Sequence, residues 1–207
     1  KAREMGITSP IEAYPSIALG TMDISVYEMV SAFNTFNNQG VWVEPIILTK
    51  IEDKNGNVLE EFVPKSREAL SKATNYIMLD MLKNVVDNGT SVRLRYKYGF
   101  DNPIAAKTGT TQNQTDGWFL GAVPDLTTGV WVGGDNRKIR FRNISLGQGA
   151  NMALPIWAKF MKRCYADSSL QVSKEGFEKP KQTLPVEIDC QEPEYEDEPE
   201  PAGDVEF

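Results

Sequence analysis

The residues best suited to chemistry lie in one short stretch, 104–111, which reads Ile-Ala-Ala-Lys-Thr-Gly-Thr-Thr. Alternate side chains of an extended strand share a face, so we expect Thr108 and Thr110 on one face and Lys107 on the other. Gly109 removes a side chain where an extended ligand could lie along the strand edge. The stretch therefore predicts a strand that holds a peptide-like ligand through its backbone and a carboxylate through the two hydroxyls and the nearby positive charge.

The residue types that usually carry other chemistries are scarce. The chain has no histidine, which excludes a Ser-His-Asp or Cys-His arrangement and argues against a conventional zinc centre. Cys164 and Cys190 are far apart in the sequence and indicate neither a zinc site nor a disulfide framework. We therefore predict no metal and no cofactor, and any nucleophile would need a lysine or a carboxylate as its base.

Composition is ordinary for a globular chain of 207 residues, with 41% hydrophobic and 25% charged side chains. The net charge of −7 is concentrated at one end, because residues 187–207 carry ten acidic side chains and no Lys or Arg. The remainder holds 22 basic against 19 acidic side chains, so no nucleic-acid surface is expected. We interpret the basic run 137–142 as a solvated loop. No apolar run approaches the roughly 18 residues that span a membrane.

Helical spacing of apolar residues predicts helices near 25–38, 71–87 and 152–165. The first begins with a capping box, Ser25-Val26-Tyr27-Glu28, and the second can be capped by Ser71. Pro155 is compatible with the first turn of the third helix. The expected buried face of the second helix comprises Ile77, Met78, Met81, Leu82, Val85 and Val86, and that of the third comprises Trp157, Phe160, Met161 and Cys164.

Short links join three β-prone segments, 104–111, 117–123 and 129–134, the last two through residues 124–128. Such links imply antiparallel neighbours, so we predict a meander with residues 107–111 at one side, where a substrate can reach them. Asn55-Gly56, between β-branched runs over 41–62, predicts a separate hairpin. The expected fold class is α+β, an antiparallel sheet flanked by helices.

Two features bear on domain organisation. Residues 1–6 read like the last turn of a helix with Gly6 past its end, so we expect a globular body over 1–166 that is the C-terminal part of a larger domain. Residues 167–207 are rich in Pro, Glu and Lys and then strongly acidic. We predict a disordered tail there, because such a composition buries too little apolar area to offset its ordering entropy.

Several motifs, taken in order, resemble the region around the Lys-Thr-Gly strand, the third active-site motif of penicillin-binding transpeptidases. Their spacing matches the class A, bifunctional members best. The resemblance extends over about residues 1–166 and is carried by the segments 15–20, 37–40, 88–90, 106–111, 116–121, 124–126 and 130–133. In this family the Lys-Thr-Gly strand works with S-x-x-K and S-x-N partners.

The resemblance implies a D,D-transpeptidase that cross-links peptidoglycan stem peptides through an acyl-serine and binds β-lactams, which mimic D-Ala-D-Ala. It implies that Lys107 assists the S-x-N serine in proton relay, and that Thr108 and Thr110 hold the substrate carboxylate. The Thr110 backbone N–H would complete the oxyanion hole, and Gly109 and Thr111 would shape the strand edge. It further implies a periplasmic, membrane-anchored parent whose anchor and glycosyltransferase domain lie outside this chain.

This chain departs from the family pattern because it contains neither S-x-x-K nor S-x-N. In the family both motifs precede the region matched here, so we expect the missing N-terminal part of the domain to supply the nucleophile, and the isolated chain to be inactive. Two alternatives remain open. One is a serine β-lactamase relative, which the Trp-rich stretch 117–134 fits less well. The other is a non-catalytic cell-wall-binding or scaffold module, against which the retained Lys107, Thr108 and Thr110 argue.

Overall fold

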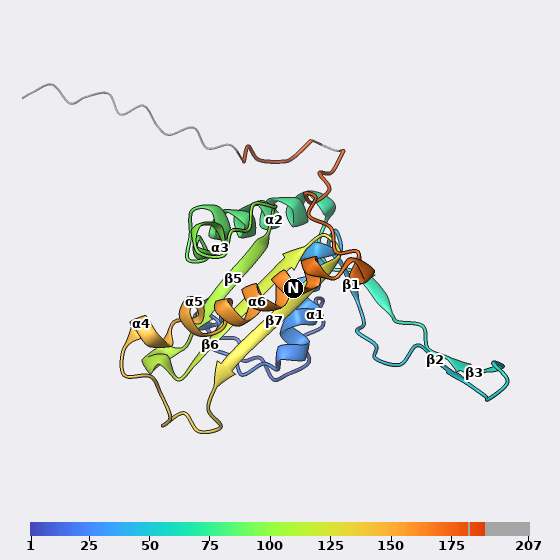
Figure 1. Ribbon diagram of the computed structural model, residues 1–207, viewed down its shortest axis with the longest axis horizontal. Coiled ribbons are helices and arrows are strands. Elements are labelled where there is room, and N and C mark those ends of the chain that lie inside the picture. Colours follow the sequence, from blue (N-terminus) through green and yellow to red (C-terminus); the bar gives the residue numbers. More distant parts are fainter. Residues whose placement is uncertain (182, 189–207) are drawn as a thin grey trace, which may run out of the picture.

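The computed structural model describes residues 1–181 and 183–188, and its centre is a three-stranded antiparallel sheet in the order β5-β6-β7 (Figure 1). The strands are β5 (Ala105–Thr110), β6 (Asp116–Val123) and β7 (Leu126–Gly133). The predicted meander is confirmed. Its second link is shorter than expected, because Val123 already pairs with Leu126 across a two-residue turn, Pro124-Asp125.

Helices cover both faces of this sheet, which confirms the α+β prediction (Figure 1). The three predicted helices are α1 (Val26–Asn37), α2 (Lys72–Asp87) and α6 (Leu154–Ala166). Sequence reasoning did not resolve the short elements, which are α3 (Arg93–Tyr96), α4 (Ile144–Gly147), α5 (Gly149–Met152) and the 3₁₀ turns η1 (Pro15–Leu19), η2 (Gln112–Gln114) and η3 (Ser168–Leu170).

Two apolar clusters separate the faces, because alternate residues of each strand point to opposite sides. On one face Phe119 packs against Trp157 of α6, with ring centroids 5.2 Å apart. On the other face Leu120 packs with Phe33 of α1 and Leu79 of α2. The sheet is therefore buried on both sides at β6, and its functional surface has to lie at an edge.

Two predicted helix faces need correction. Met81 of α2 is 60% exposed, and the buried side chains of that helix are Ala73, Asn75, Leu79, Leu82 and Val86. Phe160 of α6 is 47% exposed, whereas Leu154, Trp157, Ala158, Met161 and Cys164 are buried. In both helices the apolar stripe is wider than the strip that the sheet covers, so sequence spacing alone could not select the buried side chains.

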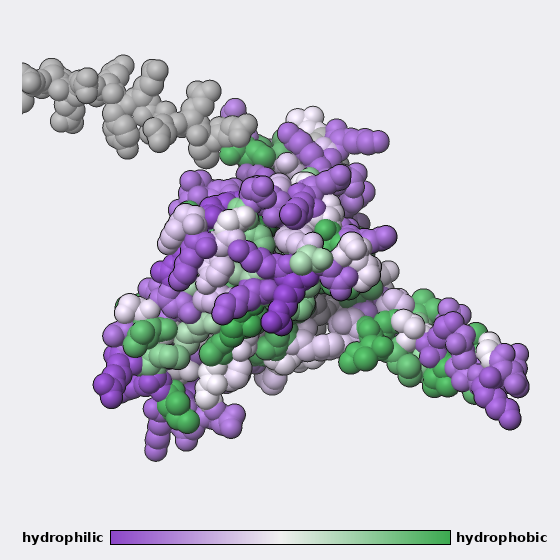
Figure 2. Space-filling view, viewed as in Figure 1, coloured by the Kyte–Doolittle hydropathy of each residue, from purple (hydrophilic) through white to green (hydrophobic). Residues whose placement is uncertain are grey.

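The predicted hairpin around Asn55-Gly56 is confirmed as β2 (Lys50–Glu52) paired with β3 (Val58–Glu61). It projects from the body as an arm that carries exposed apolar side chains (Figures 1 and 2). Residues 41–43 do not extend this hairpin but form β1 (Val41–Val43), which pairs with β4 (Ser66–Glu68). The β-branched run 41–62 is thus divided between two small sheets.

The two ends of the described chain also bear on the predictions. Ile7 N–H donates to Ala2 O and Gly6 N–H to Arg3 O, and Gly6 has φ +91°, which is the C-terminal capping pattern expected for residues 1–6. After Ala166 the chain still contacts the body, with Phe177 packed on the cluster around Phe33. Residues 182 and 189–207 of the predicted tail, with Cys190, lie outside the described residues. No helix in the described part of the chain is long and apolar enough to cross a membrane.

Candidate functional site

The strand β5 lies at the edge of the central sheet, and within the described residues it pairs with β6 alone. Thr111 N–H donates to Asp116 O at 3.2 Å, which fixes the phase of the hydrogen-bond ladder. Because paired and unpaired residues alternate along an antiparallel strand, the backbone N–H and C=O groups of Thr110 and Thr108 face away from β6. The edge therefore offers main-chain donors and acceptors to an extended ligand.

The predicted division of side chains between the two faces is confirmed by the register. Thr108 lies opposite Phe119 and Thr110 opposite Gly117, on the face covered by α5 and α6. Lys107 lies opposite Leu120, on the face of α1 and α2. The two hydroxyls thus stand side by side, and the Lys107 side chain leaves the strand on the other face.

The Thr110 hydroxyl is oriented by a backbone donor. Gly149 N–H, at the start of α5, donates to Thr110 Oγ1 at 3.1 Å. A hydroxyl that accepts this bond still has its own proton to donate. Thr110 is exposed, so the proton can be directed to an anionic group at the strand edge.

The Thr108 hydroxyl is held by a second hydroxyl. Its Oγ1 lies 2.7 Å from Oγ1 of Thr90, in the link between α2 and α3. Thr90 belongs to the segment 88–90 that carries the family resemblance, but sequence reasoning gave it no role at the site. The structure therefore shows two contacts of the β5 hydroxyls that were not predicted, Thr90 and Gly149. Sequence spacing within the strand could not predict them, because each residue belongs to another segment of the chain.

A glycine is required at the contact with Thr110. A Cβ atom on Gly149 would lie 2.3 Å from Gly109 O and 2.4 Å from Trp118 O, both backbone atoms that cannot give way. The start of α5 therefore lies directly against the β5–β6 ladder, which brings the Gly149 N–H within reach of the hydroxyl. Gly109 itself leaves room beside Trp118, since an added Cβ would be 3.1 Å from the Trp118 Cβ.

Lys107 and Thr111 are engaged locally. Lys107 is exposed, and its Nζ donates to Thr108 O at 2.7 Å, one of the outward-facing carbonyls. Thr111 Oγ1 lies 2.8 Å from Thr115 Oγ1 and accepts from Asp116 N–H at 3.0 Å. The Thr111 side chain therefore holds the turn after β5, which agrees with a role in shaping the edge.

Only one end of the strand edge is open. Ile104 and Ala106 are fully buried on the face of α6, and Ala105 is fully buried on the face of α1 and α2. Lys107 and Thr110 are exposed. A ligand that reaches the hydroxyls therefore has to lie along the C-terminal half of the strand.

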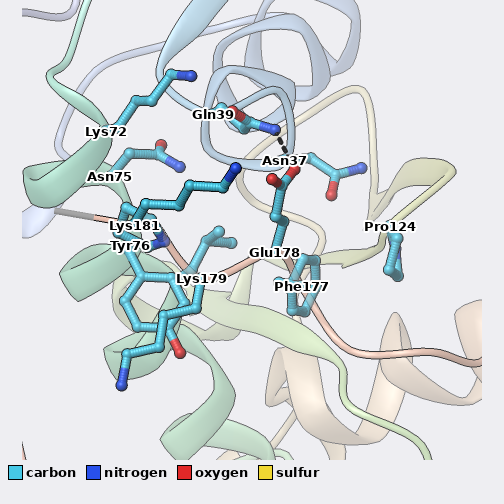
Figure 3. Close-up of a pocket in the computed structure, with 12 residues that line it drawn as sticks. Asn37, Gln39, Lys72, Asn75, Tyr76, Pro124, Phe177, Glu178, Lys179 and Lys181 are labelled. Atoms are coloured by element: carbon cyan, nitrogen blue, oxygen red, sulfur yellow. Dashed lines mark hydrogen bonds between the residues drawn. The ribbon is translucent and has the colours of Figure 1, made fainter.

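The hollow at the other end of α2 is a separate feature. It has a volume of about 580 Å³ and lies between α1, α2 and residues 177–181 (Figure 3). Gln39 Nε2 donates to Glu178 Oε2 at 2.8 Å across it. None of its lining residues belongs to β5, so it does not contribute to the site described above. Within residues 1–181 and 183–188 no cluster of His, Cys, Asp and Glu could hold a metal ion.

Comparison with known proteins agrees with this geometry. Residues 9–140 match the family model described as the penicillin binding protein transpeptidase domain. Penicillin-binding protein 1A of Aquifex aeolicus is 39% identical over 181 residues, which cover 86% of this chain and 23% of that protein. Penicillin-binding protein 2D of Bacillus subtilis is 33% identical over 193 residues, which cover 91% of this chain and 26% of that protein. The chain thus spans about a quarter of the length of these relatives.

Solved structures share the fold at lower identity. Penicillin-Binding Protein 1A from Haemophilus influenzae superimposes with a TM-score of 0.72 at 24% identity, covering 89% of this chain and 31% of that one. PonA1 from Mycobacterium tuberculosis gives a TM-score of 0.74 at 23% identity, covering 100% of this chain and 56% of that one. The fold and the family match over residues 9–140 lead to one conclusion: the chain belongs to the penicillin-binding protein transpeptidase domain family.

Proposed function

We propose that this chain is the substrate-binding half of a peptidoglycan D,D-transpeptidase domain. In this proposal β5 binds the D-Ala-D-Ala end of a stem peptide, and β-lactams occupy the same edge. PonA1 from Mycobacterium tuberculosis, which has the same fold, has been solved in complex with penicillin V. The observation that carries the proposal is the Thr110 hydroxyl, which accepts from Gly149 N–H and so keeps a proton for a carboxylate.

The chemistry follows from an acyl-serine route. A serine oxygen attacks the carbonyl carbon between the two D-Ala residues, and the peptide bond breaks as D-Ala leaves with the proton on its amine. The amine of a neighbouring stem then attacks the ester, forms a new peptide bond and returns the proton to the serine. In this proposal the outward N–H of Thr110 stabilises the oxyanion that forms in each step.

In this proposal some side chains of β5 bind the substrate and others affect the rate of acylation. Thr108 and Thr110 hold the terminal carboxylate from one face of the strand, and charge-assisted hydrogen bonds of this kind are among the stronger ones. Lys107 lies on the opposite face and acts on the proton transfer through the S-x-N serine. Gly109 and Thr111 keep the edge open and shaped for an extended peptide.

Replacing Lys107 should therefore separate rate from affinity. Lys107→Ala, made in the longer protein, is expected to slow acylation by a β-lactam while changing the dissociation constant of the non-covalent complex little. Stopped-flow acylation over a range of antibiotic concentrations measures both quantities. A selective loss of affinity would show that Lys107 binds the ligand instead.

The nucleophile is proposed to come from outside these residues. The sequence contains no S-x-x-K and no S-x-N, and the relatives are about four times as long as the part matched here. We propose that a preceding segment of the same domain supplies the serine and its base. A glycosyltransferase domain, a membrane anchor and a periplasmic location belong to the same proposal for the longer protein.

Covalent labelling tests this assignment. A fluorescent penicillin should leave the 207-residue chain unlabelled and should label the longer protein that includes an upstream S-x-x-K segment. Mass spectrometry that finds a stoichiometric penicilloyl adduct on the 207-residue chain would overturn it, because the serine would then lie among residues placed in structural roles. Sustained turnover of a chromogenic cephalosporin by the longer protein would indicate a β-lactamase. If neither the 207-residue chain nor the longer protein is labelled, the chain belongs to a non-catalytic module.

A further inference from the structure

The loop between β7 and α4 carries a cluster of cations. This loop, residues 134–143, includes Arg137, Lys138, Arg140 and Arg142 and one acidic side chain, Asp135. All four cations are exposed, and in the space-filling view hydrophilic side chains lie around this loop together with apolar ones (Figure 2). Arg137 forms a salt bridge with Asp23. In the part of the chain that the structure describes, the other three form no salt bridge.

The loop is attached to the open end of β5. Phe141 N–H donates to Gln114 O at 3.2 Å, in the turn that follows the strand. Gly147 lies so close to the same turn that a Cβ atom would meet Gln114 Cβ at 2.4 Å. Two residues further on, Gly149 contacts Thr110. The cations are therefore held beside the strand end where the hydroxyls stand.

A bound peptide has one direction in which to extend. If its terminal carboxylate lies at Thr108 and Thr110, the rest of the ligand cannot run along residues 104–106, which are fully buried between the helices on the two faces of the sheet. It has to pass the turn at residues 112–114 and approach the loop. Groups that precede the terminal dipeptide thus come next to Lys138, Arg140 and Arg142.

We propose that these three cations select stem peptides that carry a free carboxylate ahead of the D-Ala-D-Ala end over peptides in which that carboxylate is amidated. The inference rests on the proposed function, since it assumes that the carboxyl terminus binds at β5. Exposed ion pairs are individually weak, so three of them together predict a preference of about three- to tenfold at low ionic strength. Salt should reduce this preference, because the cations are solvated.

The test compares two synthetic peptides that end in D-Ala-D-Ala and differ only in a free or an amidated side-chain carboxylate ahead of it. Each is titrated into the 207-residue chain by NMR at low and at high salt. The variant combines Lys138→Gln, Arg140→Gln and Arg142→Gln. Its matched control removes the same charge from exposed positions of α6, with Lys159→Gln, Lys162→Gln and Arg163→Gln. The acidic residues of 187–207 are the same in both titrations, so any competition by them for the loop cations affects the two peptides equally.

The proposal expects the free carboxylate to bind more tightly, the loop variant to lose this preference, and the α6 variant to keep it. Equal binding of the two peptides that still depends on Thr110 would overturn the inference and leave the proposed function intact. A preference that both variants lose alike would also overturn it, because net charge rather than the loop would be responsible. Binding of neither peptide would count against the proposed function itself.

Discussion

At the residue scale, the site depends on how a single hydroxyl is oriented. Thr110 Oγ1 accepts from a backbone N–H and keeps its own proton to donate to a ligand. Thr108 is bonded to Thr90, so one proton of that hydroxyl pair remains for a ligand. The Thr110 proton and the free proton of the Thr90–Thr108 pair are two donors beside the strand edge, and they are suited to a carboxylate, which accepts through both oxygens.

Replacing Thr110 should weaken carboxylate binding. Thr110→Val keeps the shape but removes the donor and leaves Gly149 N–H without its acceptor, so affinity for a D-Ala-D-Ala peptide should fall by about 1.5–3 kcal/mol, the usual value of a hydrogen bond to a charged group. NMR titration of the 207-residue chain measures the change. Thr110→Ser, which restores the hydroxyl, should recover most of the affinity, and a serine variant as weak as the valine variant would contradict the assigned role.

The close contact between α5 and the sheet can be tested at Gly149. Gly149→Ala places a Cβ against two carbonyl oxygens of the β5–β6 ladder, so the backbone has to shift. We expect a loss of about 1–3 kcal/mol in the free energy of unfolding, as for other overpacked positions. Urea denaturation measures it. Gly176→Ala is the matched control, because its Cβ would meet only Pro103 Cγ at 3.8 Å, and a similar loss there would contradict the packing argument.

At the scale of elements, the start of α1 is tied to the preceding segment by one carboxylate. Glu28 completes the predicted capping box with Ser25 and also accepts from the side-chain and backbone groups of Ser9 and Thr8 at 2.7–2.8 Å. The hydroxyl of Ser9, followed by that of Thr8, holds the pKa of Glu28 well below its usual range. The capping box was visible in the sequence, whereas the second set of donors depends on the chain folding back.

This arrangement predicts a pH dependence. Since the folded-state pKa of Glu28 lies below the ordinary value of 4.5, the carboxylate stabilises the fold above that pH, and the contribution is lost as the pH falls below it. Glu28→Gln should lower the free energy of unfolding at neutral pH and should show a smaller further loss on acidification. Urea melts at neutral pH and at about pH 3 measure both. Glu12→Gln, at an exposed carboxyl, is the control and should behave as the parent chain. If Glu28→Gln lost as much stability on acidification as the parent chain does, the stabilising role of the Glu28 carboxylate would be refuted.

The elements also show which sequence signals were sufficient. Capping residues predicted the starts of α1 and α2 to within a residue, because their hydrogen bonds are local. Turn residues predicted the hairpin of β2 and β3 for the same reason. The buried faces were less certain, since Met81 and Phe160 continue an apolar stripe at positions that no neighbouring element covers.

At the scale of the molecule, β5 itself could be predicted from Lys107 to Thr111, but its surroundings could not. The strand has a local period of two, so its faces follow from the sequence. Thr90 reaches it from the link between α2 and α3 and Gly149 from the start of α5, and only the packing of these helices brings them there. The same limit applies after Ala166, where composition favours a tail although single apolar residues still find partners on the body.

The segment after α6 contributes to stability through such partners. Phe177 packs on the cluster that contains Phe33 and Leu79. Ser173 N–H donates to Asp125 Oδ2 at 2.9 Å, and Gln39 bonds Glu178. These contacts lie on both sides of Phe177 and hold the segment across the end of the sheet, so we propose that the folded unit extends beyond Ala166.

Phe177→Ala should therefore destabilise the body. The side chain is half-buried, so the expected loss in the free energy of unfolding is about 1–3 kcal/mol, below the 3–5 kcal/mol of a fully buried phenylalanine. Urea denaturation followed by tryptophan fluorescence measures it, and Leu170→Ala, at a 54% exposed position of η3, is the control that should change it by less than about 0.5 kcal/mol. Removing residues 167–207 should cost more than Phe177→Ala, because the flanking hydrogen bonds are lost as well. A truncated chain as stable as the parent would place the end of the folded unit at Ala166 after all.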